Sequence, residues 1–245
     1  MCVSSSHRLT SFAARLADLA LTSRLCDSQW HEYECPQMTE PQRTRMFPLG
    51  SVLVPGGPLP LHIFEPRYQQ LLNESLEDDR TFGVALISRG SEVGGGDTRT
   101  TIGTLASIIE HQRFDDGRAA VIAEGVHRIE VLEWMDDDPY PLALAVQRPD
   151  AAPSGDFVAK LDGAKLALAD LFAAAHEFGR LDELPEYGWN SDPVAATWEL
   201  CLRAPIPDLD RQAVLTADAP DDRVALLHTS INEITEDIRL MGRLG

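Results

Sequence analysis

The spacing of apolar residues changes near residue 150, and this change constrains the fold of the 245-residue chain more than any other feature. Residues 46–150 contain short apolar runs separated by glycine and proline, as is typical of strands joined by turns. Residues 151–245 instead repeat apolar residues every three or four positions, which is the period of a helix with one buried face. The sequence therefore predicts an α+β protein, in which a β-domain at 46–150 precedes a helical domain at 151–245.

The β-domain is predicted to contain about six strands and one helix. After the first strand-like segments, compact or alternating apolar runs predict strands at 82–88, 102–114, 119–123, 128–134 and 142–146. Asp115-Asp116-Gly117 favours a tight turn after the second of these strands, because glycine tolerates positive φ. The segment from Tyr68 to Leu76 carries its apolar residues on one helix face. These elements together predict a small, closed or nearly closed β-barrel with one packed helix.

The helical domain is predicted to be a bundle of about four α-helices with short loops. Helix start signals occur at Gly155-Asp156, Ser191, Pro207 and Asp221-Asp222. We expect Ser191 to cap the second helix, with Pro193 in its first turn, and Gly179 to end the first helix. The last helix has the longest apolar stripe, which runs from Val224 to Leu240.

Residues 1–45 show little strand or helix pattern, and we expect them to form a poorly ordered N-terminal extension. Leu9–Leu25 has apolar residues at roughly helical spacing, but charged residues interrupt it, so it lacks the apolar core of a signal peptide. Because Met38 and Met46 directly precede the strong pattern, the sequence suggests the hypothesis that translation starts at one of them. No apolar run reaches the length of about 18 residues that a bilayer-spanning helix needs, and we expect a cytoplasmic protein without a membrane partner.

Two neighbouring segments carry a family resemblance. The stretch from Phe47 to Gly56 and the stretch from Pro60 to Tyr68 resemble the opening of the Lon N-terminal (substrate-binding) domain family, and Gly125–Ile129 is similar to one of its strand entries. The resemblance implies a PUA-like β pseudo-barrel followed by a helical bundle. It also implies a region that, in full-length Lon proteases, helps engage protein substrates ahead of the ATPase and protease domains. This sequence looks like the stand-alone bacterial copies of the domain, which lack those two domains.

The spacing of the relevant residues argues against three kinds of catalytic or cofactor site. Cys26, His31 and Cys35 offer zinc ligands, but their spacing is not a standard zinc pattern and no second pair follows. The Gly94–Gly96 loop runs into an aspartate, whereas a phosphate-binding loop continues into lysine and serine or threonine. The only two lysines lie in one predicted helix, away from a nucleophile-like serine. We therefore predict no catalytic residue, no metal and no cofactor.

Five aromatic residues are candidates for binding apolar polypeptide segments. They are Phe64, Tyr68, Phe114, Tyr187 and Trp189. The first three also suit a core position. Tyr187 and Trp189 fall in a loop where no apolar period accounts for them, which favours exposure.

A polar cluster is expected near the first predicted helix. Its members are His62, Glu65, Arg67 and Arg128. We interpret this cluster as structural, because charged groups inside a protein persist chiefly when they are paired. Glu65 is expected to satisfy helix amides and to pair with an arginine, either Arg67 or Arg128.

These observations favour a non-catalytic binding protein that captures unfolded or extended polypeptide, or acts as a protease adaptor, in a cleft between barrel and bundle. The alternative is a PUA-like RNA-binding protein. The formal net charge of −18 opposes it, because affinity for nucleic acid depends on neutralising phosphates. A second alternative is an uncharacterised hydrolase, for which no triad or metal site can be assembled. No nucleic-acid partner is expected, and the oligomeric state stays open.

Overall fold

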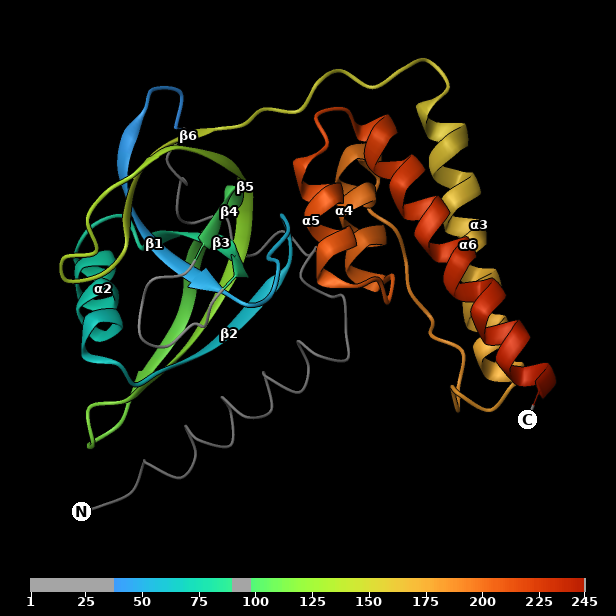
Figure 1. The fold of residues 1–245 in the computed structure, drawn as a ribbon, viewed down its shortest axis with the longest axis horizontal. Coiled ribbons are helices and arrows are strands. Elements are labelled where there is room, and N and C mark those ends of the chain that lie inside the picture. The colour runs from blue at the N-terminus through green and yellow to red at the C-terminus, as the bar shows by residue number, and fades with distance from the viewer. Residues whose placement is uncertain (1–37, 90–97, 245) are drawn as a thin grey trace.

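The computed structural model describes residues 38–89 and 98–244. Three features of the sequence lie outside these ranges: the Leu9–Leu25 segment, the Cys26, His31 and Cys35 group, and the glycines at 94–96. The described residues form a mixed sheet that closes on itself, followed by a helical bundle (Figure 1). The predicted α+β class, with a β pseudo-barrel and a helical part, is confirmed.

Six strands make the barrel in the described part of the chain. Their bounds are β1 Gln42–Leu49, β2 Pro58–Ile63, β3 Thr81–Arg89, β4 Thr98–Arg113, β5 Ala119–Trp134 and β6 Leu142–Gln147. The sheet order is β2-β5-β4-β3-β1-β6, and an additional pairing of β5 with β6 closes it. β1 changes partner along its length, since its first half is antiparallel to β6 and its second half is parallel to β3. Among these strands, β2 alone keeps a free edge.

β5 is one continuous strand of 16 residues, where the sequence predicted two. The prediction was wrong because the stretch from Glu124 to His127 interrupts the alternation of apolar residues. The ladder between β4 and β5 shifts register there, next to Leu105, so the strand bends without ending. Gly125 permits the bend, because a Cβ at this position would clash with the Val54 carbonyl oxygen.

The β-domain begins earlier than predicted. β1 starts at Gln42, and Met38 is already buried, with 2% of its surface exposed. The Met38 carbonyl accepts a hydrogen bond of 2.8 Å from the Gln147 amide, which extends the contact with β6. The boundary predicted at residue 46 is therefore a correction, since at least residues 38–45 belong to the folded β-domain rather than to an extension.

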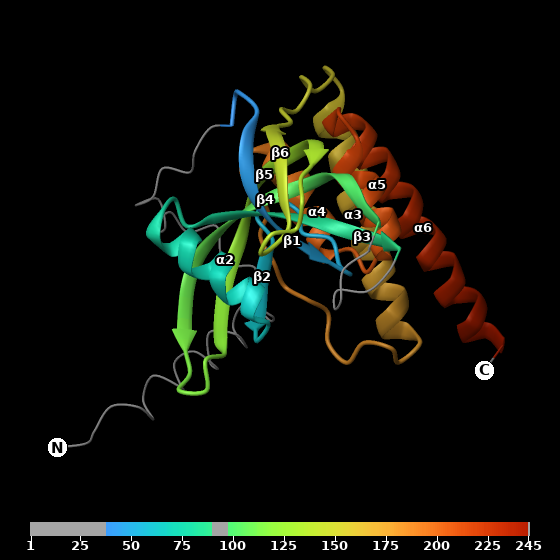
Figure 2. The same ribbon diagram turned by 60° about the vertical axis from the view of Figure 1, so that its left-hand side comes forward.

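Five helices occur in the described ranges, and four of them form the bundle. Their bounds are α2 Pro66–Glu77, α3 Phe157–Glu177, α4 Pro193–Arg203, α5 Asp208–Thr216 and α6 Pro220–Leu244. α2 packs on the barrel, whereas α3 and α6 lie side by side, with α4 and α5 between them and the strands (Figures 1 and 2). None of the helices in this part of the chain is long and apolar enough to cross a bilayer.

Two details of the bundle differ from the sequence prediction. Asp192 rather than Ser191 caps α4, because its carboxylate accepts hydrogen bonds from the Val194 and Ala195 amides. Ser191 is one residue too early for a helix that begins at Pro193. Leu240, expected on the buried stripe of α6, is 59% exposed.

The barrel and the bundle share one apolar cluster. Val54 and Ile102 of the barrel belong to the core that α3, α4 and α6 build. Two hydrogen bonds border this contact: the Gln212 amide group donates to the Ile102 carbonyl at 3.0 Å, and the Val52 amide donates to the Asp208 carboxylate at 3.3 Å. The two parts therefore pack on each other through both apolar and polar groups.

We predict that a chain beginning at Met46 is less stable than one beginning at Met38. The shorter chain lacks the half of β1 that pairs with β6, and it loses the buried Met38 side chain. Burying such a side chain contributes about 2 kcal/mol, which corresponds to about 5 °C in melting temperature for a chain of this size. Thermal unfolding followed by circular dichroism measures the difference. Equal melting temperatures for the two chains would contradict the assignment of residues 38–45 to the barrel.

Candidate functional site

Asp150 sits between two buried arginines where the barrel meets the bundle. Its carboxylate lies 2.7 Å from Nη2 of Arg128, in β5, and 2.8 Å from Nη2 of Arg223, in α6. The two arginine side chains are only 1% and 0% exposed. Asp150 itself belongs to the segment that links β6 to α3, so one carboxylate joins three separate parts of the chain.

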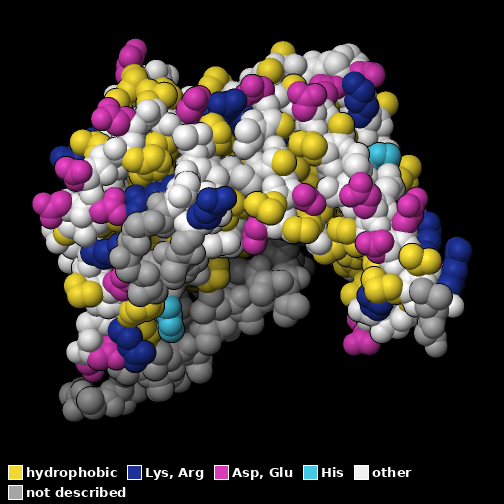
Figure 3. Space-filling model, in the orientation of Figure 1, with side chains coloured by type: hydrophobic (Ala, Val, Ile, Leu, Met, Phe, Trp, Pro, Cys, Tyr) yellow, Lys and Arg dark blue, Asp and Glu magenta, His cyan; other side chains and the backbone are white. Residues whose placement is uncertain are grey.

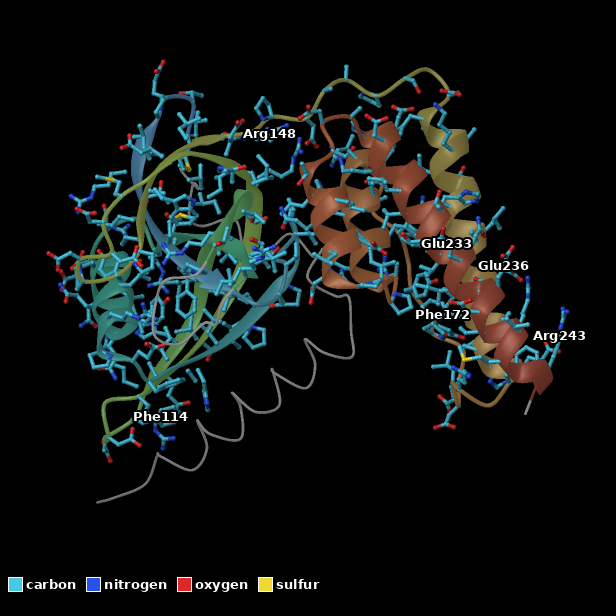
Figure 4. All side chains as sticks on the ribbon, in the orientation of Figure 1. Phe114, Arg148, Phe172, Glu233, Glu236 and Arg243 are labelled. Atoms are coloured by element: carbon cyan, nitrogen blue, oxygen red, sulfur yellow. The ribbon has the colours of Figure 1, made fainter. Side chains whose placement is uncertain are left out.

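The two arginines are satisfied in different ways. Arg128 also donates to the carbonyls of Leu215, Ala217 and Pro149. Burial lowers the pKa of Arg128, and the Asp150 charge opposes that shift. The guanidinium of Arg223 instead lies 4.2 Å from the centroid of the Trp198 ring. Its Nη2 is within ion-pair distance of Asp150, but none of its three nitrogens makes a hydrogen bond to a described residue. Arg148, at the same end of the linker (Figure 4), pairs with Glu130 and Asp218. This charged joint positions the bundle and carries no reacting group.

The polar cluster expected near the first helix does not assemble as one group. Glu65 pairs with Arg67 at 3.0 Å, which is one of the two pairings predicted, whereas Arg128 lies at the joint. The expectation that the Glu65 side chain satisfies helix amides is wrong, because no side-chain cap forms at the start of α2. The Glu65 backbone carbonyl accepts the amides of Tyr68 and Gln69 instead.

Tyr68 is part of the barrel core rather than a surface contact. It is 5% exposed and stacks on Phe47, with ring centroids 4.1 Å apart. The Arg67 guanidinium lies 4.5 Å from the Tyr68 ring centroid, so the ring also makes a cation–π contact. The interpretation of Tyr68 as a candidate binding residue is corrected accordingly.

Tyr187 and Trp189 fold onto the bundle instead of projecting from their loop. Both are partly buried against the bundle core, and their rings meet edge to face at 5.2 Å. The Arg203 guanidinium lies 4.6 Å from the first ring centroid and 4.5 Å from the second. Because the two rings are already occupied by this cation and by each other, they hold the loop in place. Strong exposure, which the absence of an apolar period suggested, is not observed.

Phe64 and Phe114 lie on the barrel, apart from the aromatic residues of the bundle. Phe64 follows β2 and is 58% exposed. Phe114 directly follows β4 and meets the His62 ring edge to face at 6.4 Å. Figure 4 places Phe114 at the end of the β4–β5 hairpin and Phe172, which packs near Tyr187, on the bundle. The predicted aromatic residues therefore occupy two separate places and do not form one cleft between the domains.

The outward face of β2 carries the most accessible part of this set. Because side chains alternate along a strand, Leu59 and Ile63 enter the barrel core, and Pro60 and His62 face outward together with the following Phe64. Pro60 and His62 are exposed. We call Pro60, His62 and Phe64 the β2 outer row.

Glu124 in β5 was not singled out by the sequence. It lies opposite Pro58 of β2 and Ser107 of β4, and burial raises its pKa to about 7. Desolvation is the cause, since a buried carboxylate loses the water that stabilises its charge. The charge that directly follows the apolar run from Ala119 to Ala123 was the available signal.

A lysine and a serine do approach each other, contrary to the sequence expectation. Lys160 Nζ lies 3.4 Å from Ser154 Oγ at the start of α3. A nucleophilic serine needs a lysine of lowered pKa, but hydrogen bonds to Asp156 and Asp221 raise the pKa of Lys160. Ser154 itself donates to the Asp221 carboxylate. The group is an exposed ion-pair network in which the lysine stays protonated.

The described ranges contain neither a group of side chains placed to bind a metal nor a reactive thiol. No group of three or more His, Cys, Asp or Glu side chains there is placed to hold a metal ion. Cys201 is buried in the bundle, and burial raises the pKa of its thiol to about 11, which keeps it protonated.

Comparison with protein families finds one match over most of the chain. Residues 43–233 match the ATP-dependent protease La (LON) substrate-binding domain. Lon protease 2 of Myxococcus xanthus is 26% identical over 83% of this chain and 25% of its own length. The Lon protease of Anaeromyxobacter dehalogenans is 24% identical over 79% of this chain and 23% of its own length. The chain thus spans about a quarter of these relatives.

Solved structures agree on the fold. A Lon N-terminal domain protein from Xanthomonas campestris superposes with a TM-score of 0.54 at 23% identity, over 77% of this chain and 98% of that one. The N-terminal domain of a Mycobacterium avium complex Lon protease gives a TM-score of 0.57 at 14% identity, over 80% and 99%. At these identities the likeness concerns the fold alone.

We predict that Asp150→Asn lowers the free energy of unfolding by about 3 kcal/mol, because it leaves two buried guanidinium groups without a carboxylate. Urea unfolding measures the change. Asp116→Asn is the matched control, since it breaks the exposed pair of Asp116 with Arg118 on the β4–β5 hairpin, and exposed pairs add little to stability. An equally small effect of both substitutions would contradict the claim that the Asp150 joint stabilises the folded chain.

A second prediction concerns Glu124 and pH. Its folded-state pKa of about 7 exceeds the ordinary glutamate pKa of 4.5, so the stability from the neutral carboxyl is fully present below pH 4.5 and lost as pH rises through 7. Glu124→Gln removes this loss, and we expect it to raise the free energy of unfolding by about 2 kcal/mol at pH 8 and much less at pH 4.5. Glu133→Gln, at an exposed position of β5, serves as control in urea titrations at both pH values. A Glu124→Gln effect that does not change with pH would count against the burial of this carboxyl.

Proposed function

We propose that this chain, which belongs to the ATP-dependent protease La (LON) substrate-binding domain family, binds unfolded or extended polypeptide through the β2 outer row. The observation that carries the proposal is the exposure of Phe64, at 58%, beside exposed Pro60 and His62 on one face of β2. Large apolar side chains that remain in water on a loop or strand end are suited to anchor a partner.

The mode of binding follows from the edge position of β2. An exposed strand edge can recruit a further strand by backbone pairing. Pro58 and Pro60 lack amide hydrogens, so the first half of β2 has fewer donors for a passing chain. Side-chain contacts rather than an added strand are therefore the basis of the proposed recognition. Such contacts tolerate variation in the client sequence.

Charge favours one class of client. On the face shown in Figure 3, Asp and Glu side chains are spread over both the barrel and the bundle, and the formal net charge of the chain is −18. This field attracts segments that combine apolar residues with lysine or arginine, and it repels acidic ones. Unfolded segments of this composition are the proposed clients, and delivery of them to a protease is the proposed adaptor role.

We predict that Phe64→Ser weakens the binding of a reduced and alkylated model protein by roughly fivefold or more, because loss of an anchoring aromatic side chain costs at least about 1 kcal/mol. Fluorescence anisotropy with a labelled client measures the dissociation constant.

Leu132→Ser is the matched control for this measurement. Leu132 lies in β5 and is 51% exposed, but it is not part of the β2 outer row. We expect this variant to bind within twofold of the unmodified chain at low salt and at moderate salt alike. Equal loss in both variants, or no binding by the unmodified chain, would refute the proposed site.

A further inference from the structure

A second line of outward side chains lies beside the β2 outer row. Every second residue of β5 from Ala119 to Ala123 belongs to the barrel core, so the alternate residues point outward. We call these outward residues, Ala120, Ile122 and Glu124, the β5 outer row. They share one face of the sheet with the β2 outer row, because Glu124 lies directly opposite Pro58, two positions before Pro60 on the same strand.

Glu124 is the charged and accessible member of the β5 outer row. Ala120 and Ile122 are buried, with 3% and 4% of their surface exposed, whereas Glu124 is partly exposed. Burial alone shifts the pKa of Glu124 upward, to about 7, and no charge or hydrogen bond from a described residue contributes to the shift. A carboxylate that is partly removed from water without a compensating partner is a candidate for binding a ligand.

The described strands on either side of Glu124 place no lysine or arginine beside it on this face. On β4, the residues that face the β5 outer row are Ser107, Glu110 and Gln112. On β2, they are Pro58, Pro60 and His62. A second carboxylate, that of Glu110, therefore lies on the same face, and neither strand supplies a lysine or arginine. A partner that covers Glu124 has to bring a cation, because burying an unpaired carboxylate is costly.

We propose that a lysine or arginine side chain of the bound polypeptide pairs with Glu124. This inference rests on the proposed function, because it takes a client on the β2 outer row as given and adds a position at which that client is basic. Six residue positions separate Pro58, which lies opposite Glu124, from Phe64. An extended client that runs along β2 advances at the same rise, about 3.3 Å per residue. Its basic residue therefore lies six positions from the residue that contacts Phe64.

Glu124 is within reach of a client that lies on β2. Adjacent strands are about 4.8 Å apart, and lysine and arginine carry their charge at the end of a long stem whose apolar part can lie on neutral surface. Pro58, between the client and Glu124, is uncharged and only partly exposed. Side chains of an extended client alternate, so two residues six positions apart face the barrel together, whereas residues five positions apart do not.

Binding of two labelled peptides at pH 8, above the pKa of Glu124, tests the proposal. The first peptide has a central phenylalanine and a lysine six positions away on each side, so that either chain direction brings one lysine to Glu124. The control peptide has the same composition, but both lysines are moved one position toward the centre, which turns them away from the barrel. Fluorescence anisotropy is expected to show at least about fivefold tighter binding of the first peptide, because a close charge pair at a partly desolvated contact contributes to affinity.

Variants of the full chain separate this inference from the proposed function. Glu124→Gln should bring the two peptides within about twofold of each other, whereas Phe64→Ser should weaken both alike and keep their ratio, as expected for distant sites. Glu133→Gln, at an exposed position of the same strand, should also keep the ratio. Equal binding of both peptides by the unmodified chain, or an unchanged ratio in Glu124→Gln, would overturn the pairing but not the β2 outer row. Failure of the unmodified chain to bind either peptide would overturn both.

Discussion

The structure depends on the shared carboxylate of Asp150. Two guanidinium groups that are removed from water, Arg128 and Arg223, meet at this one side chain. Each buried cation would be costly alone, so the barrel and the bundle can come together only in the arrangement that places both beside Asp150. The apolar contact of Val54 and Ile102 with the bundle then adds area to an interface whose geometry the charges specify.

This joint lies away from the β2 outer row, which is the proposed contact for a partner. The bundle covers one end of the barrel, and the β4–β5 hairpin with Phe114 projects from the other (Figures 1 and 4). β5 links the two regions, because Arg128 near its middle enters the joint while Ala120 and Ile122 near its start face outward. The same strand therefore contributes a residue to the contact that fixes the bundle and outward-facing residues to the surface of the barrel.

The period of apolar residues was enough to predict the fold but not the joint. Strands with period two and helices with a 3.6-residue period are local properties, so the barrel and bundle could be predicted from the sequence alone. Arg223 occupies a position on the buried face of α6, beside Val224 and Leu227, where a local pattern suggests a hydrophobic residue. Its partner Asp150 is distant in sequence, and a long-range ion pair leaves no periodic signal.

The exposure of the candidate binding residues could likewise not be predicted from the local sequence pattern. Tyr68 and Phe64 are both aromatic and lie four residues apart, yet one is in the core and the other is 58% exposed. The difference arises because Tyr68 follows the helix start at Pro66 and faces Phe47, whereas Phe64 precedes it on the outward side of β2. Tyr187 and Trp189 were expected to be exposed because their loop has no period. Arg203, on a helix that follows the loop, supplies the contact that buries them.

The two outward rows of the barrel divide one face of the sheet. Their residues pair directly, Pro60 with Ile122 and His62 with Ala120, yet the β2 side is open to solvent and the β5 side is not. Adjacent strands lie only about 4.8 Å apart, so the boundary between wet and dry surface falls within a single strand spacing. The client proposed to contact Phe64 would therefore meet a strip about one strand wide, which suits an extended segment better than a folded domain that needs a broad flat contact. The narrowness of that strip, rather than a deep cleft between barrel and bundle, is the geometric reason to expect selection of unfolded chains.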